Sequence, residues 1–385
     1  MIFFAVFYVI LLKGGKNLRI LQEKSLFYLH ISEFFTTFAR RFIAYREMSK
    51  SNTCYLVTGA AGYLGLTVTS QLIDQGANVR ALVLKNDPAR QYIPAGAEIF
   101  EGDLTDKETL RSFFRLPQGA DGRVLHIAGI VTGDPQFNRK VFDVNVGGTR
   151  NIINLCLETP GISKMVYCSS TGAIPDQPIG TPTREVEHFD PALVPGCYAQ
   201  TKAIASQEVL DACHRRGLHA CIVHPSGIMG PGDLAHGEIT KTLVRVLHGE
   251  LPVGIDGDFN LCDVRDLANG IINAAEKGRD GECYILANEP VTFKAFSDMA
   301  MDAIGGRKIR LFLPIPLVMA VAKMMEALSR LTGRKPLLPS FYISQLAKNN
   351  CFDSTKAQKE LDYHSRPYQQ TITDHIRWMQ TEGIL

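Results

Sequence analysis

Residues 54–65 read Cys54-Tyr55-Leu56-Val57-Thr58-Gly59-Ala60-Ala61-Gly62-Tyr63-Leu64-Gly65. An apolar run ends at Thr58 and a helical pattern begins at Leu64, so the glycines mark a turn between a strand and a helix. Gly59 allows the tight turn, and Gly65 lets the helix pack closely on the strand. A glycine-rich turn by itself can serve only to reverse the direction of the chain. In this strand–turn–helix setting it predicts a phosphate site instead, because the helix N-terminus offers free N–H groups.

The pattern around this turn continues along the chain. Short β-branched runs alternate with helical patterns, which is typical of an α/β fold with a parallel sheet. The expected strands are Cys54–Thr58, Asn78–Leu84, Glu98–Glu101, Arg123–His126, Lys164–Ser169 and His219–His224. The expected helices between them include Leu64–Gln75, Phe137–Leu157 and Tyr198–Arg216. We therefore predict a Rossmann-type, doubly wound parallel sheet and a dinucleotide bound at the glycine turn, with Gly62, Tyr63 and Leu64 beside it.

The alternation stops after His224, which indicates a second part of the molecule. Residues 51–225 are predicted to form the dinucleotide-binding domain. Residues 226–385 are predicted to form mainly a smaller substrate-binding lobe, with 259–287 returning to the first domain. An amphipathic helix is expected at Leu317–Leu331, packed in the core of that lobe.

The first fifty residues differ from the rest of the chain. Met1–Leu12 is wholly apolar but is shorter than the roughly twenty residues that a transmembrane helix needs. Residues 17–45 mix apolar and basic side chains, which suits a helix lying on a membrane or on a partner. The alternative, which we favour, is that translation begins at Met48 and that residues 1–50 are an extension from a misassigned start.

Composition excludes several classes of function. Among 385 residues, 45% are hydrophobic and 21% charged, and the net charge is +2, so no electrostatic attraction to nucleic acid is expected. Nine scattered cysteines contain no C-x-x-C pair, so neither a metal site nor a disulfide framework is predicted. This cysteine usage suits a reducing cytoplasm, with membrane association only if the N-terminal extension is present.

The end of the second strand bears on the choice between NAD and NADP. An acidic residue there favours NAD, whereas a basic residue accommodates the additional phosphate of NADP. Lys85 follows the strand, with Arg80 and Arg90 near and no acid before Asp87, so the sequence favours NADP. After the third strand, Asp103 and Leu104 are expected near the adenine. Asp103 can equally cap the helix that follows.

Tyr198-Ala199-Gln200-Thr201-Lys202 carries the predicted acid–base chemistry. Residues four apart share one face of a helix, so the phenol and the ammonium project together. A cation near Tyr198 would lower its pKa toward a useful range, and Lys202 can also hold the nicotinamide ribose. The fifth strand ends in Ser169-Ser170, whose hydroxyls can donate to a substrate oxygen or serve as ordinary turn residues.

Six motifs in order resemble the extended short-chain dehydrogenases/reductases, also called the NAD-dependent epimerase/dehydratase family. They are Thr58–Gly65, His126-Ile127-Ala128-Gly129, Asn145-Val146-Gly147-Gly148-Thr149, Ser169-Ser170, Tyr198–Lys202 and the loop Pro225–Gly232. The resemblance covers about residues 50–385. It implies hydride transfer between the cofactor and a substrate carbon, with Ser170, Tyr198 and Lys202 as the catalytic residues. It also implies cofactor contacts at Ala128, Gly129, Asn145, Pro225, Ser226 and Ile228. Members of the family form homodimers through a helical face, so a homodimer is a further expectation.

The branch of the family depends on residues 259–267. Phe259-Asn260-Leu261-Cys262-Asp263-Val264-Arg265-Asp266-Leu267 is similar to the corresponding stretch of 3β-hydroxysteroid dehydrogenases and dihydroflavonol reductases. Phe259 stands where many nucleotide-sugar epimerases have a phosphate-binding arginine. The leading hypothesis is therefore a dehydrogenase or reductase acting on a bulky apolar alcohol or ketone. The alternatives are a nucleotide-sugar epimerase or dehydratase, with Arg245 or Arg265 as the phosphate clamp, and a sensor that binds NAD(P) without chemistry.

Overall fold

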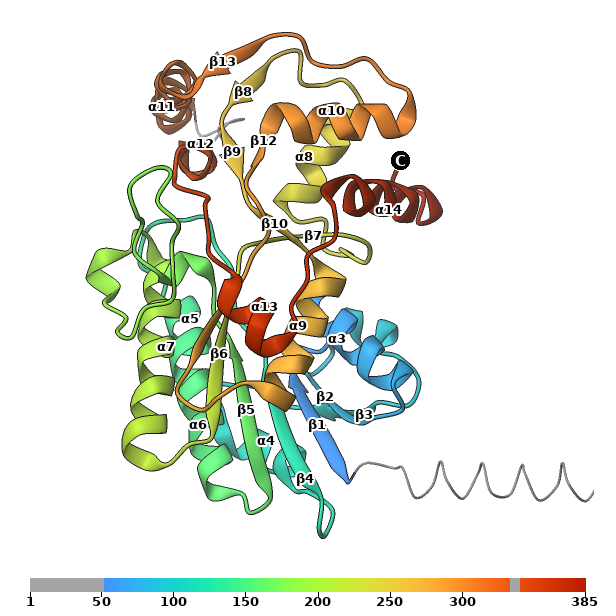
Figure 1. Cartoon of the computed structure of the whole chain (residues 1–385), viewed down its shortest axis with the longest axis vertical. Coiled ribbons are helices and arrows are strands. Elements are labelled where there is room, and N and C mark those ends of the chain that lie inside the picture. The colour runs from blue at the N-terminus through green and yellow to red at the C-terminus, as the bar shows by residue number, and fades with distance from the viewer. Residues whose placement is uncertain (1–51, 333–339) are drawn as a thin grey trace, which may run out of the picture. The chain divides into compact units, whose positions relative to one another are not determined.

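The computed structural model describes residues 52–332 and 340–385. The predicted N-terminal extension, residues 1–50, and its predicted membrane contact through residues 1–45 lie outside the described residues. Within the described part of the chain, seven strands form one parallel sheet in the order β3-β2-β1-β4-β5-β6-β11 (Figure 1). The strands are β1 (Thr53–Thr58), β2 (Asn78–Val83), β3 (Glu98–Glu101), β4 (Asp121–His126), β5 (Ile162–Cys168), β6 (Ala220–Pro225) and β11 (Cys283–Leu286). The strand order reverses between β1 and β4, which is where doubly wound sheets bind their ligands.

Helices cover both faces of this sheet (Figure 1). One face carries α3 (Tyr63–Asp74), α9 (Val264–Lys277) and α13 (Thr355–Leu361), and the other carries α4 (Lys107–Phe114), α6 (Thr149–Glu158) and α7 (Cys197–Arg216). Apart from the edge strand β3, the strands are mostly buried on both faces, which explains why they contain apolar runs rather than alternating patterns. The predicted doubly wound parallel sheet is confirmed.

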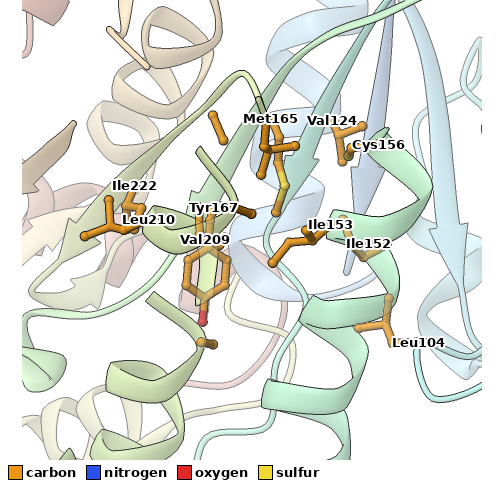
Figure 2. Packing of buried hydrophobic residues seen from close by; sticks show 14 of the residues in the cluster. Leu104, Val124, Ile152, Ile153, Cys156, Met165, Tyr167, Val209, Leu210 and Ile222 are labelled. Carbon is orange, nitrogen blue, oxygen red and sulfur yellow. The ribbon is translucent and has the colours of Figure 1, made fainter. Parts of the chain in front are cut away.

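Figure 2 shows the core on the α6 and α7 side of the sheet. Ile152 and Ile153 of α6 and Val209 and Leu210 of α7 pack in the same cluster as strand residues Val124, Met165, Tyr167 and Ile222. Tyr167 is fully buried. This packing fixes β5 and α7 relative to each other, and these two elements carry the predicted catalytic residues.

The helix predicted as one piece at Phe137–Leu157 has three parts. A short α5 (Arg139–Phe142) leads into a π-helical turn at Asp143–Gly148, and α6 continues from Thr149. The Thr149 hydroxyl donates a hydrogen bond of 2.7 Å to the carbonyl oxygen of Asn145. A π-helical turn is often found at a functional site, and this one directs the Asn145 amide toward α7.

The smaller lobe consists of short strand pairs and helices. The pairs are β7 (Gly227–Met229) with β10 (Leu261–Asp263), β8 (Gly254–Asp256) with β13 (Phe312–Pro314), and β9 (Asp258–Phe259) with β12 (Val291–Thr292). The helices are α8 (Glu238–Leu247), α10 (Phe293–Ile304), α11 (Ile315–Thr332), α12 (Ser340–Leu346) and α14 (Tyr368–Thr381). Across residues 52–332 and 340–385, none of the helices has both the length and the hydropathy that crossing a bilayer requires.

The chain returns from the lobe to the sheet twice. β11 pairs in parallel with β6, and α9 packs against α3 and the strands beneath it. Later, α13 packs on α9 and β11. The predicted return at 259–287 therefore corresponds to α9 and β11, whereas β9 and β10 belong to the small strand pairs and α13 is a second return that was not predicted.

Three buried histidines make stability depend on pH. Burial lowers the pKa of His126 to about 3 and the pKa values of His224 and His375 to about 4. In the unfolded chain, each imidazole binds a proton near its ordinary pKa of about 6.5. The unfolded state thus binds more protons between pH 6.5 and 4, so stability is lost as the pH falls through that range, by up to about 1.4 kcal/mol per pH unit for each histidine.

We expect the urea midpoint to fall more steeply between pH 6.5 and 4 than between pH 8.5 and 6.5. Carboxylates titrate in the same acidic range, so the matched variant is His375→Gln, whose amide can still contact the two partners of the imidazole, Gly230 and Thr240. Its stability should decline less steeply with falling pH than that of the wild type. If the urea midpoints of the two proteins fall in parallel as the pH is lowered, the lowered pKa of His375 is contradicted.

Candidate functional site

One large cavity opens at the carboxyl ends of β1, β4, β5 and β6. Its volume is about 2040 Å³, and it is lined by residues that directly follow these strands, among them Gly59, Ile127, Ser169 and Ser226. Pockets for one small ligand have volumes of roughly 300–1,000 Å³. The cavity therefore has room for a dinucleotide together with a second molecule.

The glycine turn forms the floor of this cavity. Gly59 has φ of +70°, and a Cβ there would lie 2.8 Å from the backbone of Ala128, which follows β4. A Cβ at Gly65 would lie 2.0 Å from the carbonyl oxygen of Gly59. Gly62 caps α3 without any side-chain hydrogen bond to the first helical N–H groups. The first turn of α3 is thus open to an anion, as binding of a pyrophosphate requires.

Not all of the basic residues near the end of β2 are available to bind the additional phosphate of NADP. Arg80 hydrogen-bonds to the Glu98 carboxylate and to the carbonyl oxygens of Phe113 and Arg115. Arg90 pairs with Glu101. Lys85 is exposed and is absent from the lining, whereas Leu84 and Asp87 line the cavity. Two of the three cations are therefore engaged elsewhere, since each has a carboxylate partner on β3.

Asp103 and Leu104 follow β3 and line the cavity. The Asp103 carboxylate accepts hydrogen bonds of 2.8 Å from the backbone N–H and the hydroxyl of Thr105. The alternative role for Asp103 as a helix cap is wrong, because Asp106 caps α4 and accepts from the N–H of Glu108. Asp103 instead holds a turn at the edge of the cavity.

Tyr198 and Lys202 lie one turn apart near the start of α7. Gly196, with φ of +85°, precedes this helix, and both side chains line the cavity. The Lys202 ammonium donates a 2.7 Å hydrogen bond to the carbonyl oxygen of Cys168 and lies 4.9 Å from the centre of the Tyr167 ring. Lys202 is thereby fixed by the end of β5, within reach of whatever occupies the cavity.

Ser170 and Ser169, which are adjacent in sequence, have different roles in the structure. The Ser170 hydroxyl accepts a 3.1 Å hydrogen bond from the N–H of Gly172, lines the cavity together with Tyr198, and acts to lower the pKa of Tyr198. The Ser169 hydroxyl is buried and lies 2.7 Å from the Ser206 hydroxyl on α7. Ser170 is therefore placed beside Tyr198, whereas Ser169 joins β5 to α7. The choice between them, which rested on family resemblance alone, has a geometric basis.

The pKa of Tyr198 shifts opposite to the direction expected from its lysine neighbour. Burial raises this pKa above its usual range, Cys168 adds to the increase, and the hydrogen bond with Ser170 opposes it. Burial also lowers the pKa of Lys202. Desolvation dominates both shifts, because the neutral forms of a phenol and an amine are favoured away from water. A protonated Tyr198 can serve as a proton donor at neutral pH.

Asn145 supports the site from behind rather than lining the cavity. Its amide accepts from the N–H of Ile130 at 2.8 Å and donates to the carbonyl oxygen of Ile130 at 3.0 Å and to the Thr201 hydroxyl at 3.1 Å. Asn145 is buried and joins the loop after β4 to the helix that carries Tyr198. Asn145 therefore braces the site, and its predicted contact with the cofactor stays a prediction.

The loop after β6 completes the lining on the other side. Pro225, Ser226 and Ile228 all face the cavity. The Ser226 hydroxyl donates a 2.8 Å hydrogen bond to the side-chain oxygen of Asn260. This bond holds the loop against the residue that precedes β10. The predicted residues that line the cavity are Gly59, Gly62, Tyr63, Leu64, Gly65, Asp103, Leu104, Ala128, Gly129, Ser170, Tyr198, Lys202, Pro225, Ser226 and Ile228.

The far wall of the cavity comes from the loop 174–195 and the stretch after α12, in which the sequence analysis names no site residue. Asn349 is buried; its amide accepts from the N–H of Gly180 at 3.3 Å and donates to the carbonyl oxygen of Thr181 at 2.7 Å. Thr183 forms a β-bridge with Phe352. These contacts tie the loop 174–195 to the stretch after α12. Because they join residues about 170 positions apart, no local motif indicates them.

Phe259 also faces the cavity, and the two arginines considered as phosphate clamps do not. The Phe259 ring packs edge-on against Phe296, with 5.2 Å between ring centres. Arg265 pairs with Asp263 and Asp374. Arg245 lies 3.9 Å from Glu250, and neither arginine lines the cavity. Among the described residues, no group of three or more His, Cys, Asp or Glu side chains could hold a metal ion.

Comparisons with known proteins agree with this fold. The profile of the NAD dependent epimerase/dehydratase family matches residues 55–287. Sterol demethylase protein B of Methylococcus capsulatus is 28% identical over 335 residues, which are 86% of this chain and 99% of that protein. Short-chain dehydrogenase/reductase family 42E member 1 of Homo sapiens is 30% identical over 353 residues, covering 85% and 87% of the two chains. The crystal structure of gox2253 is 31% identical with a TM-score of 0.74, covering 86% of this chain and 99% of that one. The matched family stretch runs from β1 to β11 and includes the glycine turn and Tyr198–Lys202.

Proposed function

Because the chain belongs to the NAD-dependent epimerase/dehydratase family of extended short-chain dehydrogenases/reductases, we propose that it interconverts an alcohol and a ketone on a bulky apolar substrate. The substrate is steroid-like or flavonoid-like. The observation that carries this proposal is the aromatic wall at Phe259, on the side of the cavity away from the glycine turn. A nucleotide sugar would need a cation for its pyrophosphate in this region, and two lysines that line the cavity, Lys241 and Lys348, are paired with Glu238 and Asp176.

The aromatic contacts of Phe259 and the ion pairs of Arg265 support an apolar substrate. Phe259, Phe293 and Phe296 form an aromatic group, and Phe259 presents its ring to the cavity. Arg265 is held by two carboxylates, so releasing it toward a ligand would leave the buried Asp263 with only Arg366, at 3.5 Å, as a cationic partner. The name of one relative, a sterol demethylase protein, is consistent with an apolar substrate of this kind.

The chemistry we propose centres on Tyr198. A reduced nicotinamide bound in the cavity would supply the hydride that the carbonyl carbon of the substrate accepts. The Tyr198 hydroxyl donates a hydrogen bond to the carbonyl oxygen and transfers its proton to that oxygen as the alcohol forms. Ser170 holds the same oxygen through its hydroxyl. Lys202 binds the ribose of the cofactor and keeps a positive charge beside the phenol as the phenolate develops.

A first experiment separates this reaction from epimerisation. The purified protein is incubated with NAD(H) or NADP(H) and a panel of hydroxysteroids, flavonoid ketones and nucleotide sugars. Nicotinamide absorbance and product chromatography are recorded together. Net oxidation or reduction of the cofactor with an apolar alcohol or ketone is expected. A rearranged sugar with no net change in the cofactor would assign the chain to the epimerases, and the significance given to Phe259 would be wrong.

We propose that Lys85 carries a preference for NADP, since Arg80 and Arg90 have other partners. Lys85→Gln should raise the KM for NADPH by about tenfold, the effect of losing one hydrogen bond to a charged group, and leave the KM for NADH unchanged. Arg90→Gln is the matched control, because Arg90 is equally basic and pairs with Glu101. A lower KM for NADH than for NADPH in the wild type, unchanged in Lys85→Gln, would overturn this proposal and indicate an NAD preference, for which Asp87, which lines the cavity, is the candidate.

A further inference from the structure

His224 holds the backbone of Ser170 from the neighbouring strand. It lies near the end of β6, which runs beside β5 in the sheet (Figure 1). The backbone pairing of these two strands ends where the N–H of Ser169 donates to the carbonyl oxygen of Val223 at 2.8 Å. One residue further along, the Nδ1 atom of His224 lies 3.0 Å from the carbonyl oxygen of Ser170. A side chain therefore continues the contact between β5 and β6 at the point where the backbone ladder stops.

The chemistry of the two groups fixes which nitrogen of His224 carries the proton. The imidazole is fully buried, and burial lowers its pKa to about 4, so the ring is uncharged near neutral pH and has one N–H group. A carbonyl oxygen can only accept a hydrogen bond, so this N–H group is at Nδ1. Nε2 is then an acceptor, and it is buried without a hydrogen-bond partner among the protein groups that the structure describes.

This unpaired acceptor distinguishes His224 from an ordinary core residue. Burying an acceptor without a partner lowers stability, and an apolar ring of similar size would avoid that cost. The Phe189 ring stacks on the imidazole, with 5.3 Å between ring centres, and an aromatic side chain without polar atoms could occupy the same place. Packing therefore does not account for a histidine at this position, whereas the donor at Nδ1 does.

Ser170, the residue that His224 holds, is one of the predicted catalytic residues. Its hydroxyl accepts from the N–H of Gly172 at 3.1 Å, and its carbonyl oxygen also accepts from the N–H of Ala173 at 3.0 Å. Both of these donors belong to the 3₁₀ turn Thr171–Ala173 that directly follows Ser170, so they move with that turn. His224 instead belongs to the central sheet, and its hydrogen bond ties Ser170 to a rigid element.

We propose that His224 is a positioning residue, which directs the Ser170 hydroxyl toward the substrate oxygen and toward Tyr198. The carbonyl oxygens of Cys168 and Ser170 are then held from two sides, by Lys202 of α7 and by His224 of β6. Ser170 acts to lower the pKa of Tyr198, so the phenol should respond to any change in the orientation of Ser170. The effect on turnover rests on the proposed function, whereas the arrangement of the three residues can be measured without a substrate.

Three variants separate the N–H donor of His224 from its ring. His224→Phe keeps an aromatic ring against Phe189 and removes the donor. His224→Asn removes the ring and keeps an amide N–H near the position of Nδ1. His224→Leu removes the donor with a smaller side chain, and it takes the place of His224→Phe if the phenylalanine variant does not fold.

His224→Phe should lower kcat for ketone reduction by about tenfold to a hundredfold, since a displacement of about 1 Å at a catalytic group can cost about 10² in rate. His224→Asn should retain most of the activity. The dissociation constant for the dinucleotide should be unchanged in both variants, because Lys202 and the glycine turn are untouched. The thermal midpoint of His224→Phe should equal or exceed that of the wild type, because the unpaired acceptor is gone.

The double variant Ser170→Ala/His224→Phe shows whether His224 acts through Ser170. It should have the same kcat as Ser170→Ala alone, because a hydroxyl that is absent cannot be misdirected. A histidine that only supports the fold would lower kcat by the same factor with and without the serine hydroxyl, and that result would overturn the proposal. His219→Phe is the matched control, since it makes the same replacement at the opposite end of β6 and outside the cavity. Its kcat should equal that of the wild type.

A second measurement needs neither substrate nor cofactor. Tyrosine is labelled with carbon-13 at Cζ, and the Tyr198 resonance is identified by its absence in Tyr198→Phe. Ser170→Ala and His224→Phe should displace this resonance in the same direction, and the double variant should displace it no further than Ser170→Ala does. His224→Asn and His219→Phe should leave it near its wild-type position. An unchanged Tyr198 resonance in His224→Phe would overturn the proposal. If the substrate panel shows no reaction, the proposed function fails, and this resonance still decides the role of His224.

Discussion

Replacing Tyr198 by phenylalanine is expected to lower kcat for ketone reduction by about 10²–10⁴-fold, the usual contribution of a positioned general acid. The hydroxyl is the only part removed, and the half-buried ring keeps its place near the start of α7. Because Lys202 and the glycine turn are untouched, the dissociation constant for the dinucleotide should change little. Stopped-flow single turnovers and titration of cofactor fluorescence measure the two quantities separately.

Tyr92→Phe is the matched control for this experiment. Tyr92 is 51% exposed and does not line the cavity, so loss of its hydroxyl should leave kcat unchanged. Full activity in Tyr198→Phe would refute the assignment of this residue as the acid. Loss of cofactor binding together with activity would mean that Tyr198 acts on the shape of the site rather than on the proton.

Replacing Gly65 by alanine should have the second largest effect. The new Cβ would lie 2.0 Å from the carbonyl oxygen of Gly59, 2.7 Å from its carbon and 2.9 Å from the Cα of Ala60. All three are backbone atoms, so either α3 or the glycine turn has to move. Overpacking of this kind costs about 3 kcal/mol, and the thermal midpoint should fall by roughly 5–10 °C. Because the same movement distorts the phosphate site, dinucleotide affinity should fall at least about tenfold.

Gly147→Ala is the control for the stability measurement, since a Cβ at that position meets nothing within 4 Å. Its thermal midpoint should equal or slightly exceed that of the wild type, because alanine favours helical backbone more than glycine does. A Gly65→Ala protein with an unchanged midpoint and unchanged affinity would show that the helix can shift freely, contrary to the packing seen here.

The parts of the site that sequence predicted are those encoded by local spacing. The glycine turn is a strand followed by a helix, and Tyr198 and Lys202 are one helical turn apart, so both can be recognised within a few residues. The same holds for the sheet, because every strand beneath the site is a short apolar run. Phe259 was recognised through a family motif and faces the cavity as that comparison implied.

The parts that sequence did not predict depend on partners far away in the chain. Arg80 seemed available to a phosphate because its strand neighbour Glu98 cannot be identified as a partner from spacing alone. Asn145 belongs to a motif that resemblance connects with the cofactor, yet its amide is used by Ile130 and Thr201. Asn349 shapes the far wall through contacts with a loop about 170 residues earlier, and nothing near it in sequence marks that role.

Because β11 lies at the edge of the sheet and late in the chain, it limits how early the sheet can be completed during synthesis on the ribosome. β6 ends at Pro225, but its outer neighbour β11 is completed only at Leu286, after β7 and β10, one of the three small strand pairs, have been made. Until then one edge of β6 has open backbone groups, and its side chains are almost wholly apolar. Nascent chains stalled between these two residues should therefore be prone to aggregate and should recruit chaperones, whereas chains released beyond β11 should not. Because the chain returns to the sheet after entering the smaller lobe, a single cut cannot separate the sheet domain from that lobe.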